Sequence, residues 1–256
     1  VTGANKGIGL QIAKQLLPSV SLLILACRDS GRGEAAAKEL GAPAVFEELD
    51  LSDGASIDAF AERVEGKYGR LDVLVNNGAV AFKGSDPTPF EEQTGPTLAT
   101  NFFGTYRLTE RLLPLLRRSP EGQIVNVASM AGKLSQLEPH RQKQFTDPGL
   151  SKEVLVDLVR EFEADVAQGQ HADKGWSNSN YGFSKLAVIA YTKILARDAP
   201  DTLKVNCCCP GYCATDMSSH KGPRSAADGA RNAVMLAQPG ISYSGVFIRD
   251  EAPAEW

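Results

Sequence analysis

Short apolar runs alternate along this chain with longer segments whose apolar residues recur at helical spacing. A strand that is buried on both faces reads as a continuous run of Val, Ile and Leu, because helices cover both sides of its sheet. The alternation therefore predicts an α/β fold with a doubly wound parallel sheet. The expected strands cover 22–27, 44–49, 73–75, 123–128, 204–208 and 246–248.

The segments between these runs have the apolar spacing of amphipathic helices. An apolar share of 43% in 256 residues suffices for one sizeable core. We therefore expect a single domain over residues 1–256. The expected helices cover 9–17, 33–40, 57–68, 90–117 and 181–199, the fourth with Pro96 inside it.

One segment, residues 132–177, interrupts this alternation. It separates a strand from the helix expected next, and it carries an amphipathic stretch of its own. We expect an ordered helical insertion with a helix at about 151–166, because the apolar residues of the stretch fall on one helical face. That face comprises Leu155, Leu158, Val159, Phe162 and Val166.

Charge and apolar patterning argue against nucleic acid and membrane partners. The 27 basic and 31 acidic residues give a net charge of -4, and no basic block would follow a phosphate backbone. The longest apolar run, 22–27, is far shorter than the roughly 20 residues of a membrane-spanning helix. We therefore expect no nucleic acid and no membrane as partner.

The five cysteines lack the spacing of a disulfide framework. Cys207, Cys208 and Cys209 are adjacent, and neighbouring side chains of a strand point to opposite faces. We expect reduced thiols and a cytoplasmic location, with Cys209 either a buried strand residue or a reactive thiol at a pocket mouth. The three histidines lack the spacing of metal ligands, so no metal site is expected.

Residues 2–9, T-G-A-N-K-G-I-G, have the spacing of a dinucleotide-binding turn between a strand and a helix. Gly3 would permit the tight turn, Gly7 the approach of the backbone to a pyrophosphate, and Gly9 close helix packing. This pattern favours a Rossmann-type sheet, although a glycine-rich turn can also serve structure alone. Because little of a strand precedes the turn, we expect the natural chain to start upstream of Val1.

The residue that follows the run 22–27 discriminates between the two nicotinamide cofactors. An NAD site usually carries an acid about 20 residues beyond the turn, where it binds the ribose 2′-hydroxyl. Here the run ends at Arg28, a cation. With Lys6 from the turn, Arg28 would bracket a 2′-phosphate, unless both are ordinary surface cations. The sequence therefore favours NADPH over NADH.

Polar residues also follow the next two expected strands. Asp50 is placed either to accept from an adenine amine or merely to cap a strand. Asn77, in N-N-G-A, would line the adenosine and ribose or form a simple Asn-Gly turn. Because open parallel sheets bind ligands at the carboxyl edge of their strands, we expect both residues at the cofactor.

Tyr181 and Lys185 lie four residues apart on a predicted helix, hence on one face. A phenol ordinarily ionises near pH 10, and a nearby ammonium favours the phenolate. Lys185 would thereby tune Tyr181 as a general acid. Ser129, at the end of the strand 123–128, would donate to a carbonyl oxygen. Asn101 would hold a water that links Lys185 to solvent, or be a locally bonded core amide.

Taken together, these segments resemble the short-chain dehydrogenases/reductases, most closely the monomeric NADPH-dependent carbonyl reductases of animals. The likeness spans nearly the whole chain and rests on T-G-A-N-K-G-I-G, V-N-N, T-N-F-F-G-T, Y-G-F-S-K and C-C-C-P-G-Y-C-A-T-D-M in that order. One departure is Gly78-Ala79, where the family usually has Ala-Gly. The resemblance implies a catalytic tetrad of Asn101, Ser129, Tyr181 and Lys185.

The resemblance implies NADPH-dependent reduction of ketones, aldehydes or quinones to alcohols. A dehydrogenase of a specific steroid, prostaglandin or lipid alcohol and a noncatalytic NADPH-sensing module remain as alternatives. The implied cofactor contacts are Gly3, Asn5, Lys6, Gly7, Ile8, Gly9, Arg28, Asp50, Leu51, Asn77, Tyr181, Lys185, Pro210, Gly211 and Thr215. The implied substrate contacts are Phe82, Lys83, Gln93, Met130 and Tyr212, the first three at positions that bind glutathione conjugates in the animal enzymes.

The long connection between Ser129 and Tyr181 bears on the oligomeric state. In oligomeric members of the resembled family this connection is shorter, and the helix of the catalytic Tyr packs against a symmetry mate. The apolar stripe of the insertion must be buried somewhere, and that helix face is the nearest surface. We therefore expect a monomer, the alternative being that the stripe itself forms a new dimer.

Overall fold

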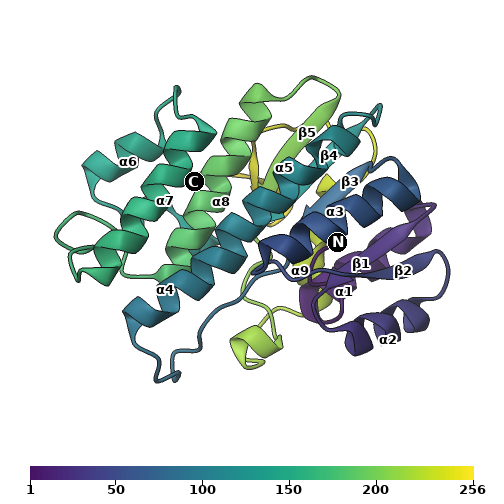
Figure 1. Ribbon diagram of the computed structural model, residues 1–256, viewed down its shortest axis with the longest axis horizontal. Coiled ribbons are helices and arrows are strands. Elements are labelled where there is room, and N and C mark those ends of the chain that lie inside the picture. Colours follow the sequence, from purple (N-terminus) through teal and green to yellow (C-terminus); the bar gives the residue numbers. More distant parts are fainter.

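A central, mostly parallel sheet carries the fold of the computed structural model, which describes all residues 1–256 (Figure 1). Five strands pair in the order β3-β4-β5-β6-β7, and two more pair as β1-β2. All pairs are parallel except β6-β7. The strands are β1 (Leu23–Cys27), β2 (Ala44–Glu48), β3 (Val73–Asn76), β4 (Gly122–Val127), β5 (Leu203–Cys208), β6 (Phe247–Arg249) and β7 (Ala252–Ala254).

The first residues of the chain join the two groups of strands. The amide of Thr2 donates to the carbonyl of Val75 at 3.0 Å, and the amide of Ala26 donates to the carbonyl of Val1 at 2.9 Å. Residues 1–3 therefore lie between β1 and β3, as the strand that feeds the glycine-rich turn. The predicted doubly wound α/β sheet is confirmed.

Helices cover both faces because successive strand residues point to opposite sides. Val75, Val125 and Cys208 pack with α1 (Gly7–Leu16) and α9 (Ala226–Leu236) on one face. Leu74, Ile124 and Cys207 belong to the larger core on the other face. That core includes residues of α3 (Gly54–Tyr68), α5 (Thr105–Leu116) and α8 (Asn180–Asp198), while α2 (Ser30–Leu40) packs beside β1 and β2.

The six expected strands are confirmed to within a residue or two, and β7 was missed. This strand is only three residues long and contains Pro253, which cannot donate to a ladder and is tolerated at an edge. Asp250 and Glu251 form the turn into it, both with left-handed backbone, at φ 50° and 63°. Nothing in the local sequence predicts such a turn, because Gly or Asn usually fills it.

The chain is helical over nearly all of the expected range 90–117, but the expected single α-helix contains a π turn. The chain forms α4 (Phe90–Leu98), a π-helical turn (Ala99–Gly104) and then α5. Pro96 lies inside α4, where it removes one backbone donor and crowds the preceding turn. Single π turns occur often at functional sites. This one contains Asn101.

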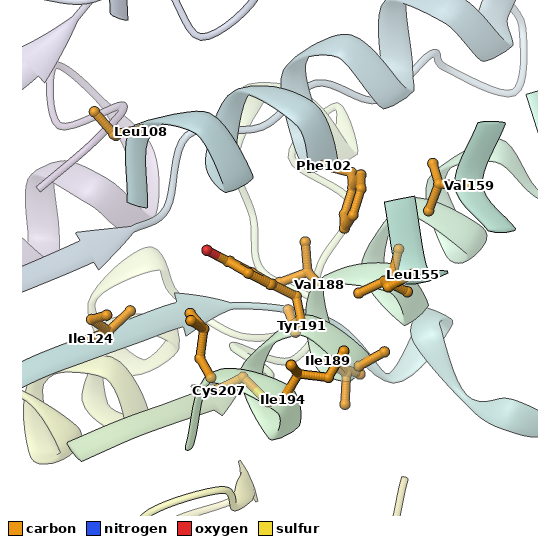
Figure 2. Packing of buried hydrophobic residues seen from close by; sticks show 14 of the residues in the cluster. Phe102, Leu108, Ile124, Leu155, Val159, Val188, Ile189, Tyr191, Ile194 and Cys207 are labelled. Atoms are coloured by element: carbon orange, nitrogen blue, oxygen red, sulfur yellow. The ribbon is translucent and has the colours of Figure 1, made fainter. Parts of the chain in front are cut away.

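The insertion is helical, with α6 (Pro139–Phe145) and α7 (Lys152–Ala167). It lies at the opposite end of the molecule from β1, β2 and α2 (Figure 1). The five residues of the predicted stripe are all buried, and α7 packs against α8 and α4. Figure 2 shows Leu155 and Val159 of α7 in the same cluster as Ile189 of α8. The insertion thus covers α8, the helix that carries Tyr181.

None of the helices combines the length and the apolar character that a membrane span requires.

Candidate active site

A cleft of about 630 Å³ opens at the carboxyl edge of the sheet. It brings the glycine-rich turn, the ends of β1 to β3, the first turn of α8 and the loop after β5 to one cavity. Every predicted cofactor residue except Gly211 lines it, together with one predicted substrate residue, Lys83. These are Gly3, Asn5, Lys6, Gly7, Ile8, Gly9, Arg28, Asp50, Leu51, Asn77, Lys83, Tyr181, Lys185, Pro210 and Thr215.

The glycine-rich turn has the backbone that its sequence predicts. Gly3 and Gly7 are left-handed, at φ 64° and 56°, which L side chains rarely adopt. A Cβ at Gly9 would collide with the carbonyl oxygen of Gly3 and the side chain of Asn77. α1 begins at Gly7 without a side-chain cap, so its first N–H groups are free for an anion such as a pyrophosphate.

Asn77 fastens this turn to the end of β3. Its Nδ2 donates to the carbonyl of Thr2 at 2.9 Å, and its backbone amide donates to the Thr2 hydroxyl at 2.9 Å. The predicted Asn-Gly turn is therefore an anchor of the glycine-rich turn, and it also lines the cleft.

Cations line the cleft where a 2′-phosphate would bind, and each of them pairs with an acid. Arg28 is 74% exposed, and its Nη1 lies 3.7 Å from Oδ2 of Asp50. The nearest acid in sequence, Asp29, is engaged as the N-cap of α2 and pairs with Arg32 at 2.6 Å. No free carboxylate therefore replaces Arg28 in binding a ribose 2′-hydroxyl, and the residues present fit NADPH. Arg32 also lines the cleft, although no sequence motif points to it.

Asp50 is held in place by its neighbours. Its Oδ1 accepts from the amide and the hydroxyl of Ser52, at 2.9 and 2.6 Å. Burial raises the pKa of Asp50, but the hydrogen bonds from Ser52 and the charge of Arg28 outweigh it and leave the pKa below its ordinary value. The carboxylate is therefore ionised at neutral pH and can only accept hydrogen bonds.

Tyr181 and Lys185 lie in the first turns of α8. Ser179 caps this helix by accepting from the amide of Gly182 at 2.9 Å. Nζ of Lys185 lies 5.7 Å from the centroid of the Tyr181 ring and donates to the carbonyl of Val127, the last residue of β4, at 2.8 Å. The helix and the strand end are thereby locked together at the cleft.

The pKa values at this site differ from the sequence-based expectation. Burial raises the pKa of Tyr181 to about 12, the nearby Cys209 adds to the rise, and a hydrogen bond with Ser129 opposes it. Burial lowers the pKa of Lys185 to about 8. The pKa of Tyr181 is therefore raised in this structure and not lowered as expected, because burial is the largest influence on it. The phenol keeps its proton at neutral pH and can donate it.

Neither Ser129 nor Asn101 lines the cleft, although the residues directly before them, Ala128 and Thr100, do. Ser129 follows β4, and its Oγ accepts from the amide of Ala131 at 3.1 Å. Asn101 is buried in the π turn, where Oδ1 accepts from the amide of Val80 at 2.8 Å and Nδ2 donates to the hydroxyl of Ser184 at 3.0 Å. The side chain of Asn101 is thus a locally bonded amide that ties the wall of the cleft to α8. A water held at Asn101 remains a prediction.

The predicted substrate residues are not gathered around the cleft. Gln93 uses its Nε2 to donate to the carbonyl of Thr88 at 2.7 Å, and Met130 packs against the larger core. Tyr212 is 57% exposed, and Phe82 is half-buried beside Lys83 without lining the cavity. Of the five, only Lys83 lines the cleft.

The loop after β5 closes one side of the cleft. Pro210 and Thr215 line it, whereas Gly211, at φ 79°, does not. Cys209 is only 4% exposed, so the structure favours a buried residue over a reactive thiol at the mouth. All five cysteines are free and buried.

The cavity contains the elements of a nucleotide site and a Tyr-Lys pair, and comparison with known proteins agrees with both. A family model described as short chain dehydrogenase matches residues 1–170 and 165–226. The chain belongs to the short-chain dehydrogenase family. Both matched segments together include all four predicted tetrad residues.

Family members of known name are similar over the whole chain. "Carbonyl reductase [NADPH] 1" of Sus scrofa is 40% identical over 270 residues, covering 100% of this chain and 93% of that protein. "Carbonyl reductase [NADPH] 1" of Homo sapiens is 38% identical, covering 100% and 97%. Among solved structures, salutaridine reductase from Papaver somniferum is 30% identical with a TM-score of 0.88, covering 96% and 97%. Menthone neomenthol reductase from Mentha piperita is 31% identical with a TM-score of 0.81, covering 96% of both chains.

Proposed function

We propose that this chain is an NADPH-dependent carbonyl reductase that converts ketones, aldehydes or quinones to alcohols. One observation carries the proposal: Tyr181 and Lys185 line the same cleft as the glycine-rich turn and Arg28. A proton donor and a site for a 2′-phosphorylated dinucleotide therefore share one cavity. The relatives named carbonyl reductase [NADPH], similar over the full chain, support the same activity.

The residues of this chain supply the proton and the geometry. The N-terminus of α1 and Arg28 would bind the phosphates of NADPH, which supplies a hydride to the carbonyl carbon when it is bound. Tyr181 would give its phenolic proton to the carbonyl oxygen, so that the product is an alcohol. Ser129 would donate a hydrogen bond to the same oxygen and orient it.

Lys185 would act on both partners of the reaction. Its contact with the Val127 carbonyl holds Nζ at the end of β4, within 5.7 Å of the Tyr181 ring centroid. A protonated Nζ at this position stabilises the phenolate that is left after proton transfer. It would also bind the ribose hydroxyls of the cofactor, and Pro210 and Thr215 would border its nicotinamide end.

Consumption of NADPH against a panel of carbonyl compounds, with NADH run alongside, tests this function. We expect turnover with NADPH and much weaker turnover with NADH. Tight NADPH binding without any turnover would instead favour a noncatalytic NADPH-sensing module. Oxidation of one steroid, prostaglandin or lipid alcohol far above every carbonyl reduction would favour a dedicated dehydrogenase.

Glutathione conjugates of carbonyl compounds form a narrower proposed substrate class. Lys83 supports it, because it is an exposed cation at the cleft that would pair with a carboxylate of the conjugate. Gln93 and Phe82 lie away from the cavity lining and lend it less support. A Lys83→Ala variant should lose activity on glutathione adducts and keep activity on the corresponding uncharged carbonyl compounds. A variant that reduces the adducts as well as the parent protein does would remove the proposal.

We further propose that the protein acts as a monomer in the cytoplasm. The five free thiols support a reducing compartment. The packing of α7 on α8 supports a monomer, because it covers the face that would otherwise be free for a partner.

A further inference from the structure

The loop after β5 is fastened from behind, by side chains outside the cleft. Nδ2 of Asn232, on α9, donates to the carbonyl of Cys209 at 2.7 Å. Nη1 of Arg224 donates to the carbonyl of Pro210, the next residue, at 3.2 Å. Arg224 and Asn232 line a separate cavity of about 440 Å³ and take no part in the lining of the cofactor cleft. Two consecutive carbonyls at the edge of the active site are thus bonded from its outer side.

Both of these side chains are held by the turn between β6 and β7. Nη2 of Arg224 donates to Oδ1 of Asp250 at 2.5 Å, and Oδ1 of Asn232 accepts from the amide of Glu251 at 2.9 Å. Asp250 and Glu251 are both left-handed, a conformation that non-glycine residues keep only where the surroundings fix it. The turn therefore offers Arg224 and Asn232 rigid partners.

The peptide between Pro210 and Gly211 is bonded at both ends. Its carbonyl accepts from Arg224, and its N–H donates to Sγ of Cys209 at 3.3 Å. A Cβ at Gly211 would lie 2.8 Å from Nη1 of Arg224, so the guanidinium lies directly against this peptide. Because a peptide unit is planar, two such bonds fix its orientation.

The same sulfur links this peptide to the other side of the site. Sγ of Cys209 also accepts from the amide of Met130 at 3.3 Å, and Met130 follows Ser129. A continuous path of hydrogen bonds therefore runs from Asp250 through Arg224 to the residue beside Ser129.

We propose that Arg224, held by Asp250, is a positioning residue for carbonyl reduction. It fixes the Pro210–Gly211 peptide, and through it the wall of the cleft beside Tyr181 and Lys185. This inference rests on the proposed function for its catalytic consequence, while its effect on the loop and on NADPH binding can be measured separately.

Arg224→Met removes the guanidinium fork and keeps a long apolar stem. We expect faster hydrogen exchange at the amides of 211–215, NADPH binding weaker by about tenfold, and a lower kcat, since one charge-assisted bond is lost. Arg231→Met is the matched control. Arg231 lines the same outer cavity and pairs with Glu251 at 3.3 Å, but it makes no contact with the loop backbone. It should leave exchange and NADPH affinity unchanged.

Two further variants separate positioning from stability. Arg224→Lys keeps the charge with a single donor group and should restore part of the NADPH affinity. Asp250→Asn should weaken NADPH binding in the parent and add nothing in the Arg224→Met background, because Asp250 acts through Arg224. Thermal melting of each variant identifies any loss that merely follows unfolding.

The inference is overturned if Arg224→Met and Arg231→Met behave alike, or if the NADPH affinity of Arg224→Met returns to the parent value once temperature is lowered to restore its folding. Faster exchange at 211–215 with weaker NADPH binding supports it even if no carbonyl compound is turned over. Absence of turnover by the parent protein would count against the proposed function alone.

Discussion

Nζ of Lys6 donates a hydrogen bond to Oδ2 of Asp216 at 2.7 Å and so joins the glycine-rich turn to the loop after β5. The sequence predicts instead that Lys6 faces a 2′-phosphate. The two side chains are 53% and 60% exposed, so the pair is solvent-screened and can exchange for a stronger anion. Asp216 would therefore compete with a 2′-phosphate for Lys6.

Replacing Asp216 by Asn should tighten NADPH binding by roughly two- to fivefold, because Lys6 is released and a like charge near the phosphate is removed. NADH binding should be unchanged, since it has no 2′-phosphate. Fluorescence titration with both cofactors measures this, and the gain should shrink as salt is added. Equal tightening of both cofactors would contradict the competition.

Replacing Arg28 by Asp should shift cofactor preference from NADPH toward NADH. The change removes a cation from the phosphate site and offers an acceptor to a ribose 2′-hydroxyl. We expect NADPH affinity to fall by about one to two decades. Lys14→Asp, on α1 outside the cleft, is a charge-matched control that should leave selectivity as it is. Unchanged selectivity of the Arg28 variant would contradict its role.

Replacing Tyr181 by Phe should abolish nearly all turnover while NADPH binding persists, because the ring remains and the proton donor is lost. Steady-state rates and cofactor titration on the same sample measure both. Tyr243→Phe, at a tyrosine that is 39% exposed and lies outside the cleft, is the control for loss of a phenol. Near-parental turnover by the Tyr181 variant would move the acid role elsewhere.

Replacing Lys185 by Met should change the pH dependence of stability in the cofactor-free protein. Burial lowers the pKa of Lys185 from 10.5 to about 8, so between these values the unfolded chain binds more protons than the folded one. The stability contribution of Lys185 therefore rises with pH from about 8 and is complete above about 10.5. The contribution of Lys185 to the free energy of unfolding differs by up to about 3 kcal/mol between the two ends of this pH range.

Urea unfolding of the parent and of Lys185→Met from pH 7 to 10 measures this difference. Above pH 8, the free energy of unfolding should rise more steeply with pH in the parent than in the variant. Tyr181, with its pKa raised to about 12, is present in both proteins, so its contribution to the difference between them should cancel. A difference that is flat across this range would show that Lys185 is not buried as a charge.

Sedimentation equilibrium at micromolar concentration should give one species near 27.4 kDa. The apolar stripe of α7 is buried against α8 within the chain, where Phe162 stacks on Phe183 with centroids 3.8 Å apart. Little apolar surface is then left on this face to drive association. A stable dimer or tetramer would contradict the monomer. The Phe162→Ala variant should lose stability by roughly 3 to 5 kcal/mol without gaining a partner.

Local sequence patterns predict the sheet, the glycine-rich turn, the Tyr181–Lys185 pair and the insertion helix, whereas the full tetrad is implied by the family resemblance. These features depend on local patterns: buried strands are continuous apolar runs, an amphipathic helix repeats its apolar face, and a tight turn requires glycine. The same short-range interactions act in any chain. The expected strand 22–27 and the expected helix 151–166 therefore agree with β1 and α7 to within two residues.

The partners of the charged and polar side chains depend on how distant parts of the chain pack together. Lys6 pairs with Asp216 and Arg224 with Asp250, pairs formed by residues distant in sequence. The raised pKa of Tyr181 and the π turn that contains Asn101 likewise depend on the residues that pack around them. Burial and long-range contacts arise only in the assembled core, where each side chain competes for the donors and acceptors within reach. A local sequence pattern does not specify the outcome of that competition.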